Sequence, residues 1–204
     1  MDSGRTCRGR SLCIVRACTA NRGSYHGIDG EARIKGARVT WELAVERKRR
    51  ILFVCIGNCC RSPLAEALLR HRGSDRFEAR SAGTRPVGFV HPVVLQVLVE
   101  RGVRVDGLCS QGCAEYVGQG FDAVITLCDC ADLRQVLDLA GGAAVVHWPT
   151  RDPYVLQWKP PEMVALAREV AAELDRRIEA LLALDWGVLS PPELKHQLAQ
   201  IGTS

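Results

Sequence analysis

The residues of this chain that are best equipped for chemistry form the stretch Cys55–Pro63, which directly follows the apolar run Ile51–Val54. Successive backbone N–H groups in a tight loop form a nest for an anion, and a helix that starts beyond the loop directs its positive end at the same point. Such surroundings stabilise a thiolate at Cys55. Arg61 adds a planar guanidinium that can bind two oxygens of a tetrahedral anion at once. The spacing therefore predicts a thiolate nucleophile held against a phosphate-like oxyanion.

The elements that must position this loop alternate along the chain from residue 51 onward. We expect strands at 51–55, 77–81, 121–128 and 143–147. We expect helices from about 62, over 91–101, over 131–139 and over 163–181, the last with apolar residues every three or four positions. Because strands and helices alternate, we predict an α/β fold: a doubly wound four-stranded parallel sheet flanked by helices, in a single domain.

Candidate residues gather at the carboxyl ends of the predicted strands. Cys55 ends the first strand, Cys128 ends the third, and the segment after His147 follows the fourth. In doubly wound sheets, ligands bind at the carboxyl ends of strands, at the point where the strand order reverses. We therefore expect these three positions to contribute to one active site.

Composition and charge divide the chain into three parts. The 204 residues are 47% hydrophobic, which suffices for one packed domain with extensions. Residues 1–50 carry 12 lysines and arginines against 5 acidic residues. We expect residues 1–48 to be a basic, disordered leader, part of it an over-extended start, residues 49–184 to form the domain, and residues 185–204 to be a C-terminal tail. Nucleic-acid binding is not expected, because a basic leader is more often a solvated tail.

The cysteine content indicates reduced thiols rather than a structural framework. Ten cysteines are present, but no Cys-x-x-Cys pair occurs and the five histidines are scattered, so no metal site is expected. The predicted chemistry needs no cofactor. Ten cysteines are too few for a disulfide scaffold of this length, which favours a cytoplasmic location. No apolar run of about 18 residues exists, so no membrane association is expected.

The motifs in and after this loop are similar to those of the low-molecular-weight protein-tyrosine phosphatase superfamily, which includes the thioredoxin-coupled arsenate reductases. Cys55–Ser62 matches the Cys-x5-Arg-Ser signature of that superfamily, with Gly57 and Asn58 in place. Three further segments fit in order, at 81–84, 121–126 and 152–154. The resemblance covers about residues 50–184.

The resemblance implies a role for each matched residue. Cys55 resembles the nucleophile that forms a phosphocysteine intermediate, and Arg61 resembles the arginine that binds the anion and stabilises the transition state. Asp152 resembles the general acid that protonates the departing oxygen and then helps water attack the phosphoenzyme. Tyr154 would help to wall the substrate entrance. The oxyanion-binding loop implied by the match consists of Ile56, Gly57, Asn58, Cys59, Cys60 and Ser62.

Two activities share this nucleophile and differ in the remaining thiols. The arsenate reductases of the superfamily keep a second redox cysteine where Cys128 falls and a third seven positions later, where this chain has Gln135. A relay that passes a disulfide from cysteine to cysteine is therefore incomplete. Cys130 could replace the third cysteine, although a Cys-x-Cys disulfide is strained, and a thioredoxin- or glutaredoxin-type reductant could also finish the cycle. Cys60 matches a neighbouring cysteine that can trap oxidised Cys55 as a reversible disulfide.

The residues that hydrolysis needs, by contrast, are all present in the sequence: Cys55, Arg61, Ser62 and Asp152. We therefore favour a phosphatase, with a phosphorylated protein or a small phosphate ester as its substrate. An arsenate reductase is the alternative. A non-catalytic oxyanion-binding protein is a third possibility, and Asp152 argues against it because binding alone needs no proton donor.

Overall fold

The computed structural model of the chain describes residues 31–34, 37–40, 47–129, 133–154 and 159–203. The chain divides into two compact units, Met1–Val45 and Glu46–Ser204. In the first unit, strand β1 (Glu31–Ile34) pairs antiparallel with strand β2 (Ala37–Thr40). Strands were not expected in this part of the chain, which was predicted to be disordered. The rest of the basic leader lies outside the described residues.

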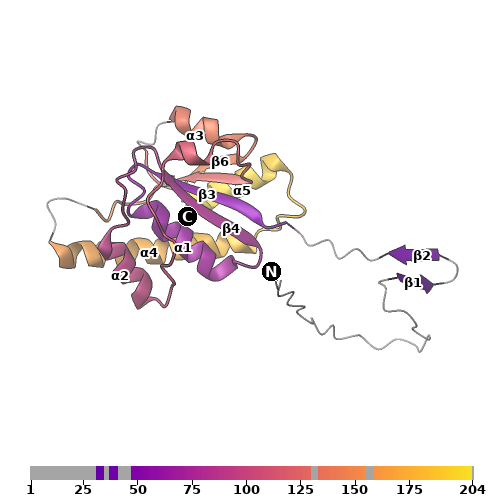
Figure 1. Cartoon of the computed structure of the whole chain (residues 1–204), viewed down its shortest axis with the longest axis horizontal. Coiled ribbons are helices and arrows are strands. Elements are labelled where there is room, and N and C mark those ends of the chain that lie inside the picture. Colours follow the sequence, from indigo (N-terminus) through magenta and orange to yellow (C-terminus); the bar gives the residue numbers. More distant parts are fainter. Residues whose placement is uncertain (1–30, 35–36, 41–46, 130–132, 155–158, 204) are drawn as a thin grey trace, which may run out of the picture. The chain divides into compact units, whose positions relative to one another are not determined.

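The second unit is built on a four-stranded parallel sheet, as predicted (Figure 1). Its strands are β3 (Arg49–Cys55), β4 (Phe77–Gly83), β5 (Ala123–Thr126) and β6 (Ala144–His147). The strand order is β4-β3-β5-β6, so the chain first moves to one side of β3 and then returns to the other. The order therefore reverses beside β3, which ends at Cys55, and this is the point at which doubly wound sheets bind ligands.

Helices cover both faces of this sheet, which confirms the doubly wound arrangement (Figure 1). The helices are α1 (Arg61–Gly73), α2 (Pro92–Glu100), α3 (Leu133–Ala140), α4 (Pro160–Ala183), α5 (Pro191–Thr203) and the short 3-10 helix η1 (Cys113–Tyr116). The first four lie close to the ranges expected from the sequence. None of the described helices is both long and apolar enough to cross a membrane.

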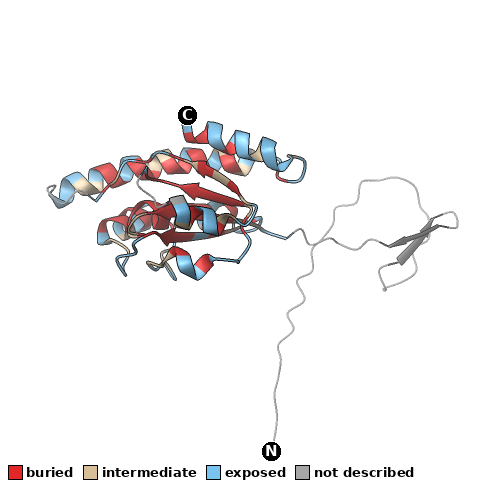
Figure 2. Ribbon diagram, turned by 90° about the horizontal axis from the view of Figure 1, so that it is seen from above, coloured by how far each residue is buried: buried red, intermediate tan, exposed pale blue. Residues whose placement is uncertain are grey.

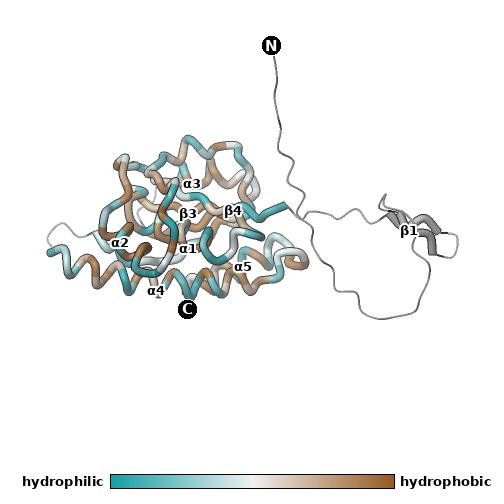
Figure 3. Tube along the Cα trace, turned by 60° about the horizontal axis from the view of Figure 1, so that its bottom comes forward, coloured by the Kyte–Doolittle hydropathy of each residue, from teal (hydrophilic) through white to brown (hydrophobic). Residues whose placement is uncertain are grey.

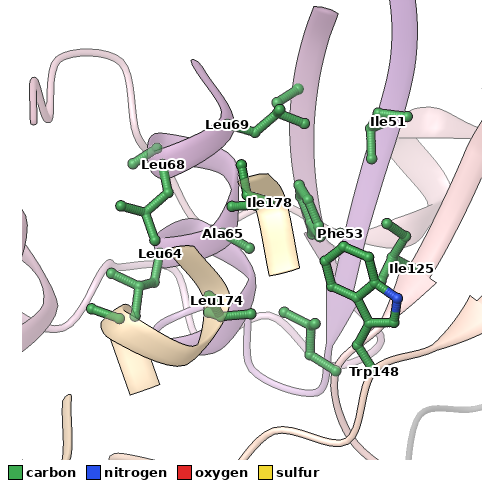
Figure 4. Close-up of a cluster of buried hydrophobic side chains, with 14 of the residues drawn as sticks. Ile51, Phe53, Leu64, Ala65, Leu68, Leu69, Ile125, Trp148, Leu174 and Ile178 are labelled. Atoms are coloured by element: carbon green, nitrogen blue, oxygen red, sulfur yellow. The ribbon is translucent and has the colours of Figure 1, made fainter. Parts of the chain in front are cut away.

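Successive residues of β3 point to opposite faces of the sheet and build two hydrophobic clusters. Ile51 and Phe53 belong to the larger cluster, and Figure 4 shows side chains of α1 and α4 gathered beside them. Leu52 and Val54 belong to the smaller cluster, together with residues of α3 and η1. All four are fully buried, and each such burial contributes about 1.5–3 kcal/mol. Buried residues accordingly concentrate on the strands (Figure 2), while hydrophobic and hydrophilic residues alternate along α4 (Figure 3).

The C-terminal residues correct the sequence-based expectation of a tail at 185–204. Residues 191–203 form α5, which packs on β6, with Leu198 fully buried and Ile201 nearly so. The Trp148 indole Nε1 donates a hydrogen bond to Leu198 O at 2.8 Å. The tail prediction is wrong because Pro191-Pro192 begins a helix, as proline does well at a first turn, and the apolar positions after it share one face.

Candidate active site

The predicted oxyanion loop connects the end of β3 to the start of α1. Cys55 is the last residue of β3 and only 2% exposed, and α1 begins at Arg61. The Sγ atom of Cys55 lies 3.0 Å from Oγ of Ser62, within hydrogen-bonding distance. A hydroxyl at this position can donate to a thiolate and stabilise its charge. The structure thus places the predicted nucleophile at the base of a loop that opens a helix.

Asn58 holds the turn of this loop from inside. Its φ of 45° lies in the left-handed region, which asparagine tolerates better than other non-glycine residues. Its side-chain Nδ2 donates to Oγ of Ser62 and to Oγ of Ser81, both at 2.9 Å, and its Oδ1 accepts from the backbone N–H of Gln111 at 2.6 Å. Gly83 must lack a side chain, because a Cβ there would lie 2.6 Å from Ile56 O.

A buried carboxylate supports this turn from behind. Ser81 Oγ donates to Oε2 of Glu66 at 2.7 Å, and the guanidinium of Arg70 approaches Oε1 at 3.4 Å. Burial raises the pKa of Glu66, and the hydrogen bonds only partly oppose this shift. Glu66 and Gln111 were not expected at the loop, and Ser81 was expected only within the matched segment 81–84, since nothing in their local spacing connects them to the loop.

The loop lies on one side of a cavity of about 310 Å³. The cavity is lined by Cys55, Ile56, Gly57, Cys59, Cys60, Arg61, Val87, Phe89, His91, Asp152 and Tyr154. The structure therefore brings together the predicted nucleophile, arginine, acid and entrance tyrosine, while Asn58 and Ser62 lie behind the wall. Val87, Phe89 and Tyr154 are 49%, 51% and 40% exposed, so they form an apolar mouth.

Arg61 and Asp152 meet inside this cavity although 91 positions separate them. The Arg61 Nη2 atom donates to Oδ2 of Asp152 at 2.6 Å, and the other carboxylate oxygen accepts from the N–H of Tyr154 at 3.0 Å. Arg61 is 8% exposed, and its Nε is buried without a hydrogen-bond partner among the described residues. A buried donor without a partner costs about 1–3 kcal/mol, so an oxyanion that accepts from Nε would relieve this cost.

His91 is a cavity residue that the sequence analysis did not identify. It caps α2, because its Nδ1 accepts from the N–H of Val93 at 3.2 Å, and its own backbone N–H donates to Cys59 O at 2.9 Å. Its ring packs against Tyr154, with ring centroids 5.0 Å apart. Burial lowers the pKa of His91, consistent with a neutral ring that accepts at Nδ1. The sequence signal that could have identified His91 as a helix cap is its position immediately before Pro92, the first residue of α2.

The remaining predicted thiols are placed differently. The thiols of Cys59 and Cys60 share a hydrogen bond. This bond lowers the pKa of Cys59, and the same bond together with burial raises the pKa of Cys60. Cys128 is buried and does not line the cavity. It nevertheless follows Leu127, whose N–H donates to Val54 O at 2.8 Å, so it lies near the same end of the sheet. Cys130 lies outside the described residues.

Comparison with known proteins places this architecture in a family. The family model described as low molecular weight phosphotyrosine protein phosphatase matches residues 50–184. The chain belongs to this family. Among curated members related to it, an arsenate reductase of Halalkalibacterium halodurans is 31% identical over 133 residues, covering 65% of this chain and 94% of that protein. A glutaredoxin arsenate reductase of Synechocystis is 25% identical over 135 residues, covering 66% and 97%.

Solved structures of the phosphatase family share the fold of the second unit. An arsenate reductase in the phosphate-binding state is 26% identical, with a TM-score of 0.57, covering 66% of this chain and 97% of that one. A low molecular weight protein tyrosine phosphatase of T. tengcongensis, at 24% identity, has a TM-score of 0.56, covering 66% and 98%. The family of enzymes is thus shown, and it contains both phosphatases and arsenate reductases.

Proposed function

We propose that this family member is a phosphatase that hydrolyses phosphate monoesters of the phosphotyrosine type through a phosphocysteine intermediate. The observation that carries the proposal is the unpartnered Nε of Arg61, buried in a cavity lined also by Cys55 and Asp152. A phosphate group in the loop would accept from this donor and from backbone N–H groups. It would then lie between a nucleophile and a proton donor.

In the first step, the Cys55 thiolate attacks phosphorus, an S–P bond forms and the P–O bond to the leaving group breaks. Asp152 gives its proton to the departing oxygen. The carboxyl is paired with Arg61 in the described structure. A bound phosphate would take over the guanidinium and leave the carboxyl group free to face the departing oxygen.

In the second step, a water molecule attacks the phosphocysteine. Asp152, now ionised, accepts a proton from this water. The S–P bond breaks and its electron pair returns to Cys55 as a thiolate, which Ser62 stabilises from 3.0 Å away. Inorganic phosphate leaves, and the site is restored without a metal or an external reductant.

The mouth of the cavity favours an aryl ester over a bare inorganic anion. Val87, Phe89 and Tyr154 surround the entrance with exposed apolar surface, which a phenyl leaving group could cover. The substrate could be a phosphorylated protein or a small aryl phosphate. A thiolate nucleophile requires reducing surroundings, which fits a cytoplasmic location.

A second candidate function is arsenate reduction. The curated relatives named above are arsenate reductases, and Cys128 lies two residues beyond the end of β5, the strand beside β3. In that alternative, a thioredoxin- or glutaredoxin-type reductant would complete a cycle for which Gln135 supplies no thiol. Binding of an oxyanion without turnover is the third alternative.

One experiment separates the three candidates. The protein is offered an aryl phosphate at mildly acidic pH and, separately, arsenate with a thioredoxin or glutaredoxin system. We expect phosphate release that Cys55→Ser abolishes and that Cys109→Ser, a change at an exposed cysteine outside the cavity, leaves intact. Turnover of arsenate with the thiol system, without release of phosphate from the aryl ester, would favour the arsenate reductase over the phosphatase. Binding without turnover of either substrate would support the non-catalytic oxyanion-binding protein.

A further inference from the structure

The segment that leads to Asp152 is fixed from α4 by a buried arginine. Arg177 is 7% exposed, and its Nη1 donates to Pro149 O at 2.9 Å and lies 3.3 Å from Oγ1 of Thr150. Its Nη2 donates to Gly202 O on α5 at 3.1 Å, and Glu173 balances its charge at 2.9 Å. One side chain thus ties the C-terminal helix to the backbone three positions before the proposed acid and to the hydroxyl two positions before it.

Helix α5 also packs directly on the backbone of this segment. A Cβ at Gly202 would lie 2.5 Å from His147 O and 2.5 Å from Cδ1 of Trp148, so no side chain fits there. Trp148 in turn donates its indole N–H to Leu198 O at 2.8 Å. Thr150 Oγ1 donates to Trp148 O at 2.8 Å, which closes the turn. Residues 147–148 are therefore held by α5, and residues 149–150 by Arg177 of α4.

Apart from the pair between its own carboxylate and Arg61, the contacts near the acid offer less restraint. Arg151 pairs with Glu169, but both side chains are 61% exposed, and exposed pairs contribute about 0–1 kcal/mol. The oxyanion loop, by contrast, is held by Asn58 and its partners, none of which belongs to α4 or α5. Binding of the anion and placement of the backbone before the acid thus depend on separate groups of contacts, which the pair between Arg61 and the Asp152 carboxylate joins.

We propose that α5 and Arg177 form a brace that positions Asp152 for proton transfer. The family model ends at residue 184, so α5 lies outside the residues matched to the family. Arg177 contacts neither the nucleophile nor the cavity, and is therefore a positioning residue. The inference rests on the proposed function, because it assigns the acid role to Asp152.

The test uses leaving-group dependence, which a merely structural role would not change. Protonation of the leaving oxygen matters greatly for phenyl phosphate and little for para-nitrophenyl phosphate, whose leaving group is stable as an anion. In Arg177→Met the hydrogen bonds to Pro149 and Gly202 are lost while the aliphatic bulk remains. We expect kcat/KM to fall roughly 10-fold more for phenyl phosphate than for para-nitrophenyl phosphate. The inhibition constant of inorganic phosphate should stay within about 2-fold, because the oxyanion loop is held by other contacts.

Two further variants keep the test informative if Arg177→Met folds poorly. Gly202→Ala forces α5 away from residues 147–148 and should produce the same selective loss. Gly187→Ala is the matched control, because its nearest neighbour would be a side-chain oxygen of Asp185 at 3.5 Å, an ordinary contact. Thermal unfolding of each variant shows that the folded protein is being assayed.

The variant Asp152→Asn supplies the reference for loss of the acid. If it shows the selective loss but Arg177→Met and Gly202→Ala do not, the brace is overturned and the proposed function stands. If Arg177→Met and Gly202→Ala lose kcat/KM equally on both substrates and bind inorganic phosphate more weakly, the brace is also overturned, because the whole site is then disturbed. If Asp152→Asn itself shows no leaving-group dependence, the acid role fails, and the inference fails with it.

Discussion

At the scale of single residues, the loop is held by side chains that never touch the proposed substrate. Asn58 is fully buried, and three hydrogen bonds of its amide join the loop to Ser62, to β4 and to the segment before η1. Buried polar groups of this kind are costly to leave unpaired. Their removal should therefore lower both the stability of the fold and the affinity for anions.

We predict that Asn58→Ala lowers the free energy of unfolding by about 2–4 kcal/mol, since it leaves buried partners unpaired and puts alanine at a positive φ. It should also weaken inhibition by inorganic phosphate at least several-fold. Urea denaturation and inhibition kinetics measure the two effects. Asn58→Gly removes the same hydrogen bonds but tolerates the φ of 45°, so it separates the loss of hydrogen bonds from the backbone strain. A stability of Asn58→Gly equal to that of the native protein would show that the hydrogen bonds contribute nothing.

Glu66 should make stability depend on pH in a direction opposite to ordinary surface carboxylates. Burial raises its pKa above the value of 4.5 expected in the unfolded chain. Between these two values the folded protein holds a proton that the unfolded chain has released, so stability from this group declines as pH rises. We therefore predict that the stability difference, native minus Glu66→Gln, falls as pH increases from 4.5 toward neutrality.

Urea denaturation between pH 4 and 7 measures this difference. Gln197→Ala, which removes no titratable group from an exposed position of α5, is the control and should give a flat difference. A difference between native protein and Glu66→Gln that grows with pH would contradict the assignment of a raised pKa.

At the scale of elements, α5 belongs to the domain and seals one side of the core. Leu198 is fully buried and belongs to the larger hydrophobic cluster, together with Trp148 and residues of α4. The expected domain boundary at residue 184 would have cut this contact. Helix α5 thus packs on β6, the edge strand of the sheet.

We predict that Leu198→Ala lowers the free energy of unfolding by about 2–4 kcal/mol, because it removes buried surface and leaves a cavity. Chemical denaturation measures the change. Gln197→Ala, an exposed position on the same helix, should change stability by less than about 0.5 kcal/mol. Equal effects of the two substitutions would show that α5 does not pack as described.

At the scale of the whole second unit, one carboxylate joins helices from distant parts of the chain. Asp175 on α4 accepts from Arg72 on α1 at 2.6 Å and from Arg101, which follows α2, at 2.5 Å. Burial alone would raise the pKa of Asp175, but the hydrogen bonds and charges of the two arginines outweigh it and lower the pKa. The cluster therefore ties three helices together only while the carboxylate is ionised.

We predict that Asp175→Asn lowers the free energy of unfolding by about 1–3 kcal/mol at neutral pH. The stabilisation is present above the unfolded value of 3.8 and is lost as pH falls through the lower folded pKa. The penalty of the substitution should thus shrink in acid, as denaturation at pH 7 and below pH 4 can measure. Glu169→Gln, which breaks the largely exposed pair with Arg151, should cost under about 1 kcal/mol. A penalty for Asp175→Asn that does not change with pH would rule out the ionic explanation.

What the sequence determined by itself was the fold class and the loop at its centre. Continuous apolar runs mark parallel strands, and the order from Cys55 to Arg61 places a thiol and a guanidinium on one short loop. Both signals are local, because side-chain periodicity and loop spacing are written in neighbouring residues. The sheet and the position of Cys55 at its switch point could therefore be predicted correctly.

Only the tertiary structure decided what surrounds that loop. It placed Asp152 against Arg61, brought His91 and Phe89 to the cavity mouth, and packed α5 on the segment before the acid. These contacts join residues far apart in the chain, and they depend on strand order and on the course of each loop. No local pattern encodes such pairings: Asp152 and Tyr154 were assigned to the site by resemblance to the superfamily, whereas the contact of Asp152 with Arg61 and the places of His91, Phe89 and α5 came only from the tertiary structure.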